Sequence, residues 1–322
     1  MMKTISNGVY PSQQELIALR LHARELPLTI QRTTQSDMAG QHHSKFRGRG
    51  MDYEESRGYQ AGDDVRNMDW RVTARSGQPH IKVYHEERER PVIVMADFGP
   101  RMFFATEGVF KSIIVSRAAA MIAWAAIHNG DRIGALLFNH QHHELRPLSG
   151  KRGALRLVHE LINVADPVHM THQHKQESNS FNDALTRLHR VTRPGSLIYI
   201  FSDFYQLDNN SKRQLQLLRR HNDVIACQVL DRLELQAPVP GRYPLSYAGQ
   251  HAVLDTTTKA KRDAWIQHFS GRRQRVKDIM QQSAIPLLQL TTADDVSVRL
   301  REFLARPKRP VKARKGYKRV AA

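Results

Sequence analysis

Two aspartates with the potential for chemistry stand at the ends of apolar stretches. Asp97 ends the run VIVMAD, and Asp203 ends the run LIYIFSD. Ligands of parallel α/β sheets bind beyond the carboxyl ends of the strands, and carboxylates that converge there supply the oxygen ligands that Mg²⁺ or Mn²⁺ prefers. An aspartate at the end of a strand also commonly caps the loop or helix that follows. The sequence therefore predicts either a cation site or a pair of caps at one edge of a sheet.

A dense block of charge, SRGYQAGDDVRNMDWRVTAR at residues 56–75, has neither a helical nor a strand period of apolar residues. Its charged residues are Arg57, Asp63, Asp64, Arg66, Asp69, Arg71 and Arg75. The arginines can form forked ion pairs with the aspartates, Gly62 permits a tight turn, and Trp70 offers an apolar anchor. We therefore expect a structural latch that packs on the neighbouring sheet. Phosphate binding is the alternative, but the interleaved aspartates would repel a polyanion.

The other reactive side chains favour packing over catalysis. Histidines cluster at residues 41–46, 139–146 and 169–174, in stretches typical of loops and with scattered partners, so we expect solvated histidines there. Cys227 lies in an apolar strand pattern and is predicted to be a packed small side chain. Ser202 lacks a G-x-S-x-G context, and the sequence contains no G-x-x-x-x-G-K-[ST] phosphate loop. The sequence therefore predicts no enzyme.

Strands that alternate with helices must position these residues. Continuous apolar runs predict strands at 90–97, 131–139, 195–203, 223–231 and 286–292, and a hairpin at 242–255. Helical patterns fall at 108–130, 153–164, 181–191, 211–221, 259–283 and 294–306. This alternation predicts an α/β fold with a doubly wound, mostly parallel sheet and helices on both faces.

The rest of the chain divides by composition. We expect a short helix at 12–26 and a polar loop within residues 1–50, a charged, β-rich segment at 51–89 with a strand near 81–84, the α/β domain at 90–305 and a basic disordered tail at 306–322. The apolar stretch 118–127 is about half as long as a membrane span. A single cysteine fits a reducing compartment, so we expect a cytoplasmic protein.

The charged block carries a resemblance to a known family. It resembles the MoxR-associated proteins of domain-of-unknown-function family 58, whose hallmark is an arginine, a Y-x-x-G-D-D-x-R-x-x-D-W core and an A-R before the first sheet strand. The matching residues are Arg57, Tyr59, Gly62, Asp63, Asp64, Arg66, Asp69, Trp70, Ala74 and Arg75. The runs VIVMAD, GDRIGALLF and LIYIFSDF resemble a von Willebrand factor A-like domain, and the whole resemblance covers roughly residues 40–305.

The von Willebrand resemblance implies a metal-ion-dependent adhesion site, built from a D-x-S-x-S loop, a threonine and a further aspartate. The corresponding positions here are Asp97, Gly99, Arg101, Asn179 and Asp203. Both serines are replaced, and the guanidinium of Arg101 could satisfy the two carboxylates without an ion. The resemblance therefore implies a degenerate adhesion site, in which Asp97 and Asp203 would hold Mg²⁺ or Mn²⁺ if any metal is bound.

The expected function is that of a non-enzymatic interaction protein. The resemblance implies a partnership with a MoxR-type AAA+ ATPase in maturing or remodelling a client complex. An acidic client would dock at the edge that carries Asp97 and Asp203, and the basic tail would reach a partner or the anionic inner face of the membrane. The net charge of +18, from 49 lysines and arginines against 31 aspartates and glutamates, supports a nucleic-acid-binding protein as the alternative. A metal-dependent enzyme at the two aspartates is a further alternative.

Overall fold

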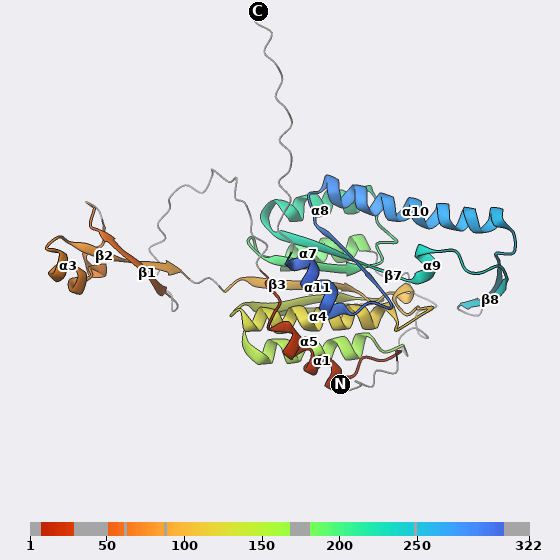
Figure 1. Ribbon diagram of the computed structural model, residues 1–322, viewed down its shortest axis with the longest axis horizontal. Helices are drawn as coiled ribbons and strands as arrows, with labels where there is room; N and C mark the ends of the chain where they lie inside the picture. Colours follow the sequence, from red (N-terminus) through yellow and green to blue (C-terminus); the bar gives the residue numbers. More distant parts are fainter. Residues whose placement is uncertain are drawn as a thin grey trace, which may run out of the picture. The chain divides into compact units, whose positions relative to one another are not determined.

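The computed structural model describes residues 8–28, 51–60, 63–86, 89–167, 181–247 and 250–305. The chain forms two compact units, which we describe separately (Figure 1). The main unit comprises residues 1–30 and 90–322, and the smaller unit comprises residues 31–89.

A six-stranded sheet lies at the centre of the main unit, with the strand order β10-β7-β6-β3-β4-β5. Its strands are β3 (Pro91–Asp97), β4 (Arg132–Phe138), β5 (His142–Leu148), β6 (Leu197–Ser202), β7 (Asp223–Leu230) and β10 (Leu287–Thr291). Neighbouring strands are parallel except β5, which runs antiparallel to β4. The predicted doubly wound, mostly parallel sheet is confirmed. Because β6 and β7 are buried along their whole length, both faces of the sheet must be covered.

Helices cover the sheet on both faces (Figure 1). One layer consists of α1 (Gln13–Ala18), α2 (Arg20–Ala23), α4 (Lys111–His128), α5 (Gly150–Val164) and α11 (Val296–Leu304). The other consists of α7 (Phe181–Val191), α8 (Asn209–His221) and α10 (Lys259–Gln282). Each predicted helix and strand of this domain is present, with its ends shifted by a few residues. Within the described residues, no helix has both the length and the apolar character that crossing a bilayer requires.

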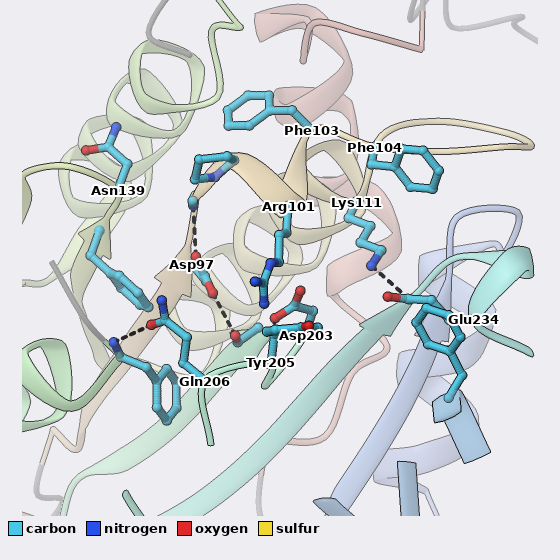
Figure 2. A pocket seen from close by; sticks show the side chains of 16 residues that line it. Asp97, Arg101, Phe103, Phe104, Lys111, Asn139, Asp203, Tyr205, Gln206 and Glu234 are labelled. Carbon is cyan, nitrogen blue, oxygen red and sulfur yellow. Dashed lines mark hydrogen bonds and ion pairs between the residues drawn. The ribbon is translucent and has the colours of Figure 1, made fainter. Parts of the chain in front are cut away.

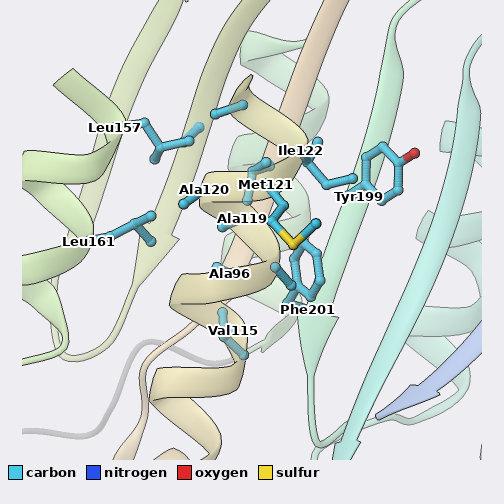
Figure 3. Close-up of a cluster of buried hydrophobic side chains, with 14 of the residues drawn as sticks. Ala96, Val115, Ala119, Ala120, Met121, Ile122, Leu157, Leu161, Tyr199 and Phe201 are labelled. Atoms are coloured by element: carbon cyan, nitrogen blue, oxygen red, sulfur yellow. The ribbon is translucent and has the colours of Figure 1, made fainter. Parts of the chain in front are cut away.

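Helix α4 is the centre of the larger hydrophobic cluster. It is buried around most of its circumference, because it lies between the sheet and the outer helix α5. Its small residues Ala119 and Ala120 let neighbouring elements pack close to α4. Met121 and Ile122 reach the aromatic side chains of β6 (Figure 3). The predicted apolar helix is therefore a core helix of the domain.

The amino-terminal helices belong to the main unit. The indole nitrogen of Trp124 donates a hydrogen bond of 2.9 Å to the carbonyl of Leu16, and Arg117 forms an ion pair with Glu15. The expected helix at 12–26 is interrupted, since α1 and α2 are separate short helices.

One edge of the sheet corrects the sequence prediction. Residues 142–148, part of a histidine-rich stretch expected to be a loop, form strand β5. As an edge strand with most of its side chains half-buried or exposed, β5 lacks the apolar alternation on which the prediction relied. His143 in this strand pairs with Glu160 of α5 at 2.7 Å. The other two histidine clusters lie outside the described residues.

A hairpin projects from the region after β7. Helix α9 (Arg232–Leu235) is followed by β8 (Arg242–Tyr247) and β9 (Gln250–Asp255), which pair antiparallel. The predicted hairpin at 242–255 is confirmed.

The smaller unit is a two-stranded ribbon with short helices. Strand β1 (Met51–Gly58) pairs antiparallel with β2 (His80–Glu86), and η1 (Val65–Asn67) and α3 (Trp70–Ser76) lie between them in sequence. The predicted strand near 81–84 lies within β2. Helix α3 was not predicted, because every residue of this helix is exposed or half-buried, which leaves no apolar stripe.

The charged block of the smaller unit uses its aspartates mainly as caps, which corrects the expected set of forked ion pairs. Asp69 accepts hydrogen bonds from the backbone N–H groups of Arg71 and Val72 and from the hydroxyl of Ser56. Asp64 likewise accepts from the backbone N–H of Arg66. The ion pair between Arg57 and Asp63, at 2.8 Å, is of the expected kind.

Other residues of the family pattern have structural places of a different kind. The Tyr59 N–H donates to the carbonyl of Pro79 at 2.8 Å. The Trp70 ring is 69% exposed and so anchors no core within the smaller unit, while Arg66 and Arg75 are exposed. Gly62 lies outside the described residues. Packing of this segment on the main domain stays a prediction.

Candidate functional site

The carboxyl ends of β3 and β6 bring Asp97 and Asp203 to the same edge of the sheet, as expected (Figure 2). Beyond them lies a cavity of about 740 Å³, which we call the carboxyl-edge cavity. Its lining residues are Asp97, Gly99, Pro100, Arg101, Phe103, Phe104, Lys111, Phe138, Asn139, Phe181, Ser202, Asp203, Tyr205, Gln206, Glu234 and Phe269. Asn179, the remaining predicted site position, lies outside the described residues.

Asp97 is engaged in local hydrogen bonds on both of its oxygens. Its Oδ1 accepts from the Gly99 N–H at 2.8 Å, and its Oδ2 accepts from the Ser202 hydroxyl at 2.7 Å. A Cβ at position 99 would lie 3.1 Å from Oδ1, so the glycine gives the carboxylate room. Burial, and next the negative charge of Asp203, raise the pKa of Asp97 to about 7, although these hydrogen bonds and Arg101 oppose the rise.

Asp203 caps the turn that follows β6. Its Oδ1 accepts from the N–H of Tyr205 at 2.8 Å, and only 8% of the residue is exposed. The turn places Phe204 in the left-handed region at φ 54°, where its N–H donates to the Ser202 hydroxyl and its ring enters the core. Burial of this ring holds a conformation that costs a non-glycine residue energy. The turn thereby sends Tyr205 outward to the mouth of the cavity.

Arg101 binds an aromatic ring, which corrects the expected salt bridge with the aspartates. Its guanidinium carbon lies 3.0 Å from the centroid of the Tyr205 ring, and that of Arg272 lies 3.3 Å from the same centroid. Two planar groups this close to one ring must occupy opposite faces, so Tyr205 lies between two cations. Among the described residues, no ion pair joins Arg101 to Asp97 or Asp203. Burial lowers the pKa of Arg272, and Arg101 adds to the effect, while Tyr205 and Asp203 oppose it.

Five phenylalanines supply the apolar part of the cavity: Phe103, Phe104, Phe138, Phe181 and Phe269. Phe181 is buried, with its ring centroid 6.3 Å from that of Phe138, whereas Phe104 is 44% exposed at the mouth. The cavity therefore combines an aromatic wall with cations and carboxylates, a surface suited to side chains of mixed character.

A match to a known protein family identifies the family of this chain. Residues 55–276 match the family described as "Protein of unknown function DUF58". The chain belongs to the DUF58 family. The match spans the charged block of the smaller unit and the main unit as far as α10, so both parts of the molecule carry the family's sequence.

The curated relatives of this DUF58 chain include the uncharacterized protein Rv1480 of Mycobacterium tuberculosis, which is 29% identical over 301 residues, or 89% of each chain. Solved structures with a similar trace include an aerotolerance-related membrane protein from Bacteroides fragilis, with 12% identity and a TM-score of 0.43 over 66% of this chain and 96% of that one. BatB from Bacteroides thetaiotaomicron gives 12% identity and a TM-score of 0.41 over 67% and 97%. A von Willebrand factor type A protein from Catenulispora acidiphila gives 8% and 0.35 over 70% and 43%.

The described residues of this site do not form a donor set that fits a divalent cation. Both oxygens of Asp97 already accept hydrogen bonds, and the two positions that would supply hydroxyl ligands are Gly99 and Arg101. The nearby guanidinium of Arg101 adds a fixed positive charge that repels a cation. In the described part of the chain, no group of three or more histidine, cysteine, aspartate or glutamate residues is placed to hold a metal ion.

A third aspartate lies at this edge and was not predicted. Asp231 follows β7 and is fully buried, and its carboxylate accepts hydrogen bonds from the N–H and hydroxyl of Thr106 and the hydroxyl of Thr292. Burial acts to raise the pKa of Asp231, but these bonds hold it below its usual value. The signal was present in the sequence, since Asp231 ends an apolar run in the same way as Asp97 and Asp203 do.

A buried ion pair was also missed. Lys111, the first residue of α4, is only 2% exposed, and its ammonium lies 2.8 Å from the Glu234 carboxylate. Glu234 also accepts from the Asp231 N–H, which ties the start of α4 to the end of β7. Lys111 and Glu234 are 123 positions apart in the sequence, so no local sequence pattern reveals the pair.

Proposed function

We propose that this DUF58 protein is a non-enzymatic adaptor that docks an acidic segment of a partner protein at the carboxyl-edge cavity. The observation that carries the proposal is the stack of Arg101, Tyr205 and Arg272, of which Arg101 and Tyr205 line the aromatic cavity. Guanidinium groups held by a ring keep their N–H edges available for bidentate contacts with carboxylates. Tyr205, which is 41% exposed, holds the two guanidinium groups in place on its ring.

The geometry of the polar groups supports binding over catalysis. Ser202 is 1% exposed, and its hydroxyl both donates to Asp97 and accepts from the Phe204 N–H. Cys227 is buried in β7, and burial raises the pKa of its thiol far above the usual range, which disfavours a reactive thiolate. Both candidate nucleophiles therefore serve packing and hydrogen bonding in this proposal, and the site works without a metal.

The proposed energy source is a MoxR-type AAA+ ATPase. The support for it is the resemblance of the charged block, from Arg57 to Arg75, to MoxR-associated proteins. In this scheme the adaptor presents an acidic client to the ATPase in the cytoplasm. The basic residues at 306–322 hold the complex near an anionic surface such as the inner face of the membrane.

Affinity purification from the native cell tests the proposal. The tagged protein is compared with an Arg101→Gln/Arg272→Gln variant after nuclease treatment at moderate salt, and bound proteins are identified by mass spectrometry. The matched control is Arg213→Gln/Arg220→Gln, which removes the same charge from exposed positions on α8. We expect an AAA+ ATPase or an acidic client that is lost only from the first variant.

Two outcomes contradict the proposal. If the natural protein and both variants recovered the same partner equally, the Arg101–Tyr205–Arg272 stack would not be part of the binding surface. Recovery of only ribosomal or nucleoid proteins, released together as salt rises, would favour the second candidate function, nucleic-acid binding driven by the net charge of +18.

A further inference from the structure

A second concave surface lies at the opposite edge of the sheet from Asp97 and Asp203. It is a groove of about 520 Å³, which we call the amino-edge groove, bordered by the starts of β3 and β4, by β5 and by the segment at the end of α7. Its apolar lining includes Ile93 of β3, Leu145 of β5 and Val191 at the end of α7. Val191 is 37% exposed, so this lining is accessible to a partner.

Four arginines line this groove: Arg132, Arg146, Arg190 and Arg193. Arg146, Arg190 and Arg193 are exposed, and in the described part of the chain their guanidinium groups have no ion-pair or hydrogen-bond partner. Glu144, the carboxylate among the lining residues, is already paired with Arg187 at 2.8 Å. The groove therefore holds an excess of positive charge in a concavity, where a low-dielectric wall strengthens the local field.

The chemistry of the groove selects among anionic partners. Single-stranded nucleic acids bind on aromatic side chains that stack with bases, and none of the described lining residues is aromatic. Aliphatic side chains between guanidinium groups instead match a peptide in which carboxylates alternate with apolar side chains. A flexible segment can lay its apolar side chains on Ile93 and Leu145 while its carboxylates reach the arginines at the rim.

We propose that the amino-edge groove is a docking site for an acidic, partly apolar segment of a partner protein, bound through Arg146, Arg190 and Arg193. This site is separate from the proposed function, which concerns the carboxyl-edge cavity at the other end of the strands. With both sites occupied, one chain bridges two acidic segments across its sheet.

Fluorescence anisotropy tests this inference with the full-length protein. The probe is a fluorescein-labelled short peptide in which glutamate alternates with valine and leucine. The variant Arg146→Gln/Arg190→Gln/Arg193→Gln removes three charges from the groove, and Lys151→Gln/Arg152→Gln/Arg156→Gln removes three from the exposed side of α5. We expect the groove variant to bind the peptide at least about tenfold more weakly, since each hydrogen bond to a charged group is worth about 1.5–3 kcal/mol. The α5 variant should bind like the natural protein.

Other outcomes would overturn the inference. These are failure of the natural protein to bind the peptide, equal weakening in both triple variants, or tighter binding of a thymidine oligonucleotide that depends on the same three arginines. If only Arg101→Gln/Arg272→Gln weakened binding of the peptide, the peptide would bind in the carboxyl-edge cavity. This result would contradict docking in the amino-edge groove and would agree with the proposed function. Because every residue substituted in the two triple variants is exposed, circular dichroism should show both variants folded.

Discussion

Asp97 stands where the sequence predicted a possible cation ligand, and in the structure it anchors a loop. The carboxylate stands at the end of β3, where a cation ligand is expected, yet it accepts hydrogen bonds from Gly99 and Ser202 and so fastens the loop after β3 to the end of β6. The missing hydroxyls at positions 99 and 101 leave these two donors as its partners. Asp97 therefore anchors this loop through its hydrogen bonds, and its raised pKa lets it keep a proton in the folded chain.

The raised pKa of Asp97 makes a prediction about stability and pH. An unfolded aspartate loses its proton near pH of about 4, whereas Asp97 in the folded chain keeps it up to about pH 7. Between these values the folded state binds more protons than the unfolded state, so this residue makes the free energy of unfolding fall as pH rises. Above pH 7 the ionised Asp97 remains a cost.

The variant Asp97→Asn should remove this slope. The amide oxygen can accept from the Gly99 N–H, and the Ser202 hydroxyl can rotate to accept from the amide group. We expect little change at mildly acidic pH and, at mildly alkaline pH, a gain of up to about 4 kcal/mol, because the folded and unfolded pKa values differ by about three units and each unit is worth about 1.4 kcal/mol. Thermal melts across the pH range measure this. Asp208→Asn is the contrasting control, because hydrogen bonds from Ser211 lower the pKa of Asp208 and its stabilising effect is lost as pH falls. A parallel pH response of Asp97→Asn and the natural protein would contradict the assignment.

The buried Lys111 makes a second prediction at this scale. Lys111→Met keeps the length of the side chain but leaves the Glu234 carboxylate without its ammonium partner. Because 19% of the Glu234 side chain remains exposed, we expect a loss of about 2 kcal/mol, less than the 3–5 kcal/mol typical of a fully buried pair. Denaturant unfolding of Lys111→Met, of Glu234→Gln and of the double variant gives the coupling free energy between the two side chains. Additive losses would show that the pair has no net interaction.

Elements differ in how much of their structure the sequence makes visible. Strands β3, β6 and β7 are predictable because they are buried on both faces, which requires uninterrupted apolar runs. The edge strand β5 and the exposed helix α3 have no such requirement, so apolar periodicity misses both. For α3 the usable signals are its ends: Asp69 as the N-cap and Gly77, at φ 71°, after its last residue.

The cap of α3 can be tested directly. Asp69→Ala removes the acceptor for two backbone N–H groups and for Ser56, and should destabilise the smaller unit by about 1–2 kcal/mol. Hydrogen exchange on the full chain should show faster exchange in residues 69–76 than in the control Asp64→Ala, whose aspartate caps only η1. Unchanged exchange would exclude a stabilising cap. A simultaneous fall in the melting temperature of the main unit would support the latch hypothesis.

At the scale of the whole molecule, topology explains which site residues were predictable. Parallel strands must deliver Asp97 and Asp203 to one edge, so their proximity follows from the order of the strands alone. The partner of Arg101 does not follow, because Tyr205 and Arg272 reach it from a turn and from α10, and side-chain torsions decide whether the guanidinium meets a carboxylate or a ring. The same limit applies to the Lys111–Glu234 pair, whose members are 123 positions apart.

The net charge belongs to the whole molecule and makes the last prediction. Eight of the 49 lysines and arginines lie in residues 306–322, so ending the chain at Ala305 lowers the net charge from +18 to about +10. Binding of a single-stranded oligonucleotide should weaken steeply with salt. For each tenfold rise in salt concentration, the logarithm of the binding constant falls by about 0.7 per neutralised phosphate. Truncation removes cations and should therefore make this salt dependence less steep. Arg101→Gln/Arg272→Gln should leave the slope nearly unchanged while abolishing capture of the protein partner. If the partner were instead released at the same salt concentration as the oligonucleotide, and equally from both variants, charge alone would account for the interaction. Because the Arg101–Tyr205–Arg272 stack combines ring contact with charge, the proposed adaptor role predicts that the partner stays bound at salt concentrations at which the oligonucleotide has dissociated.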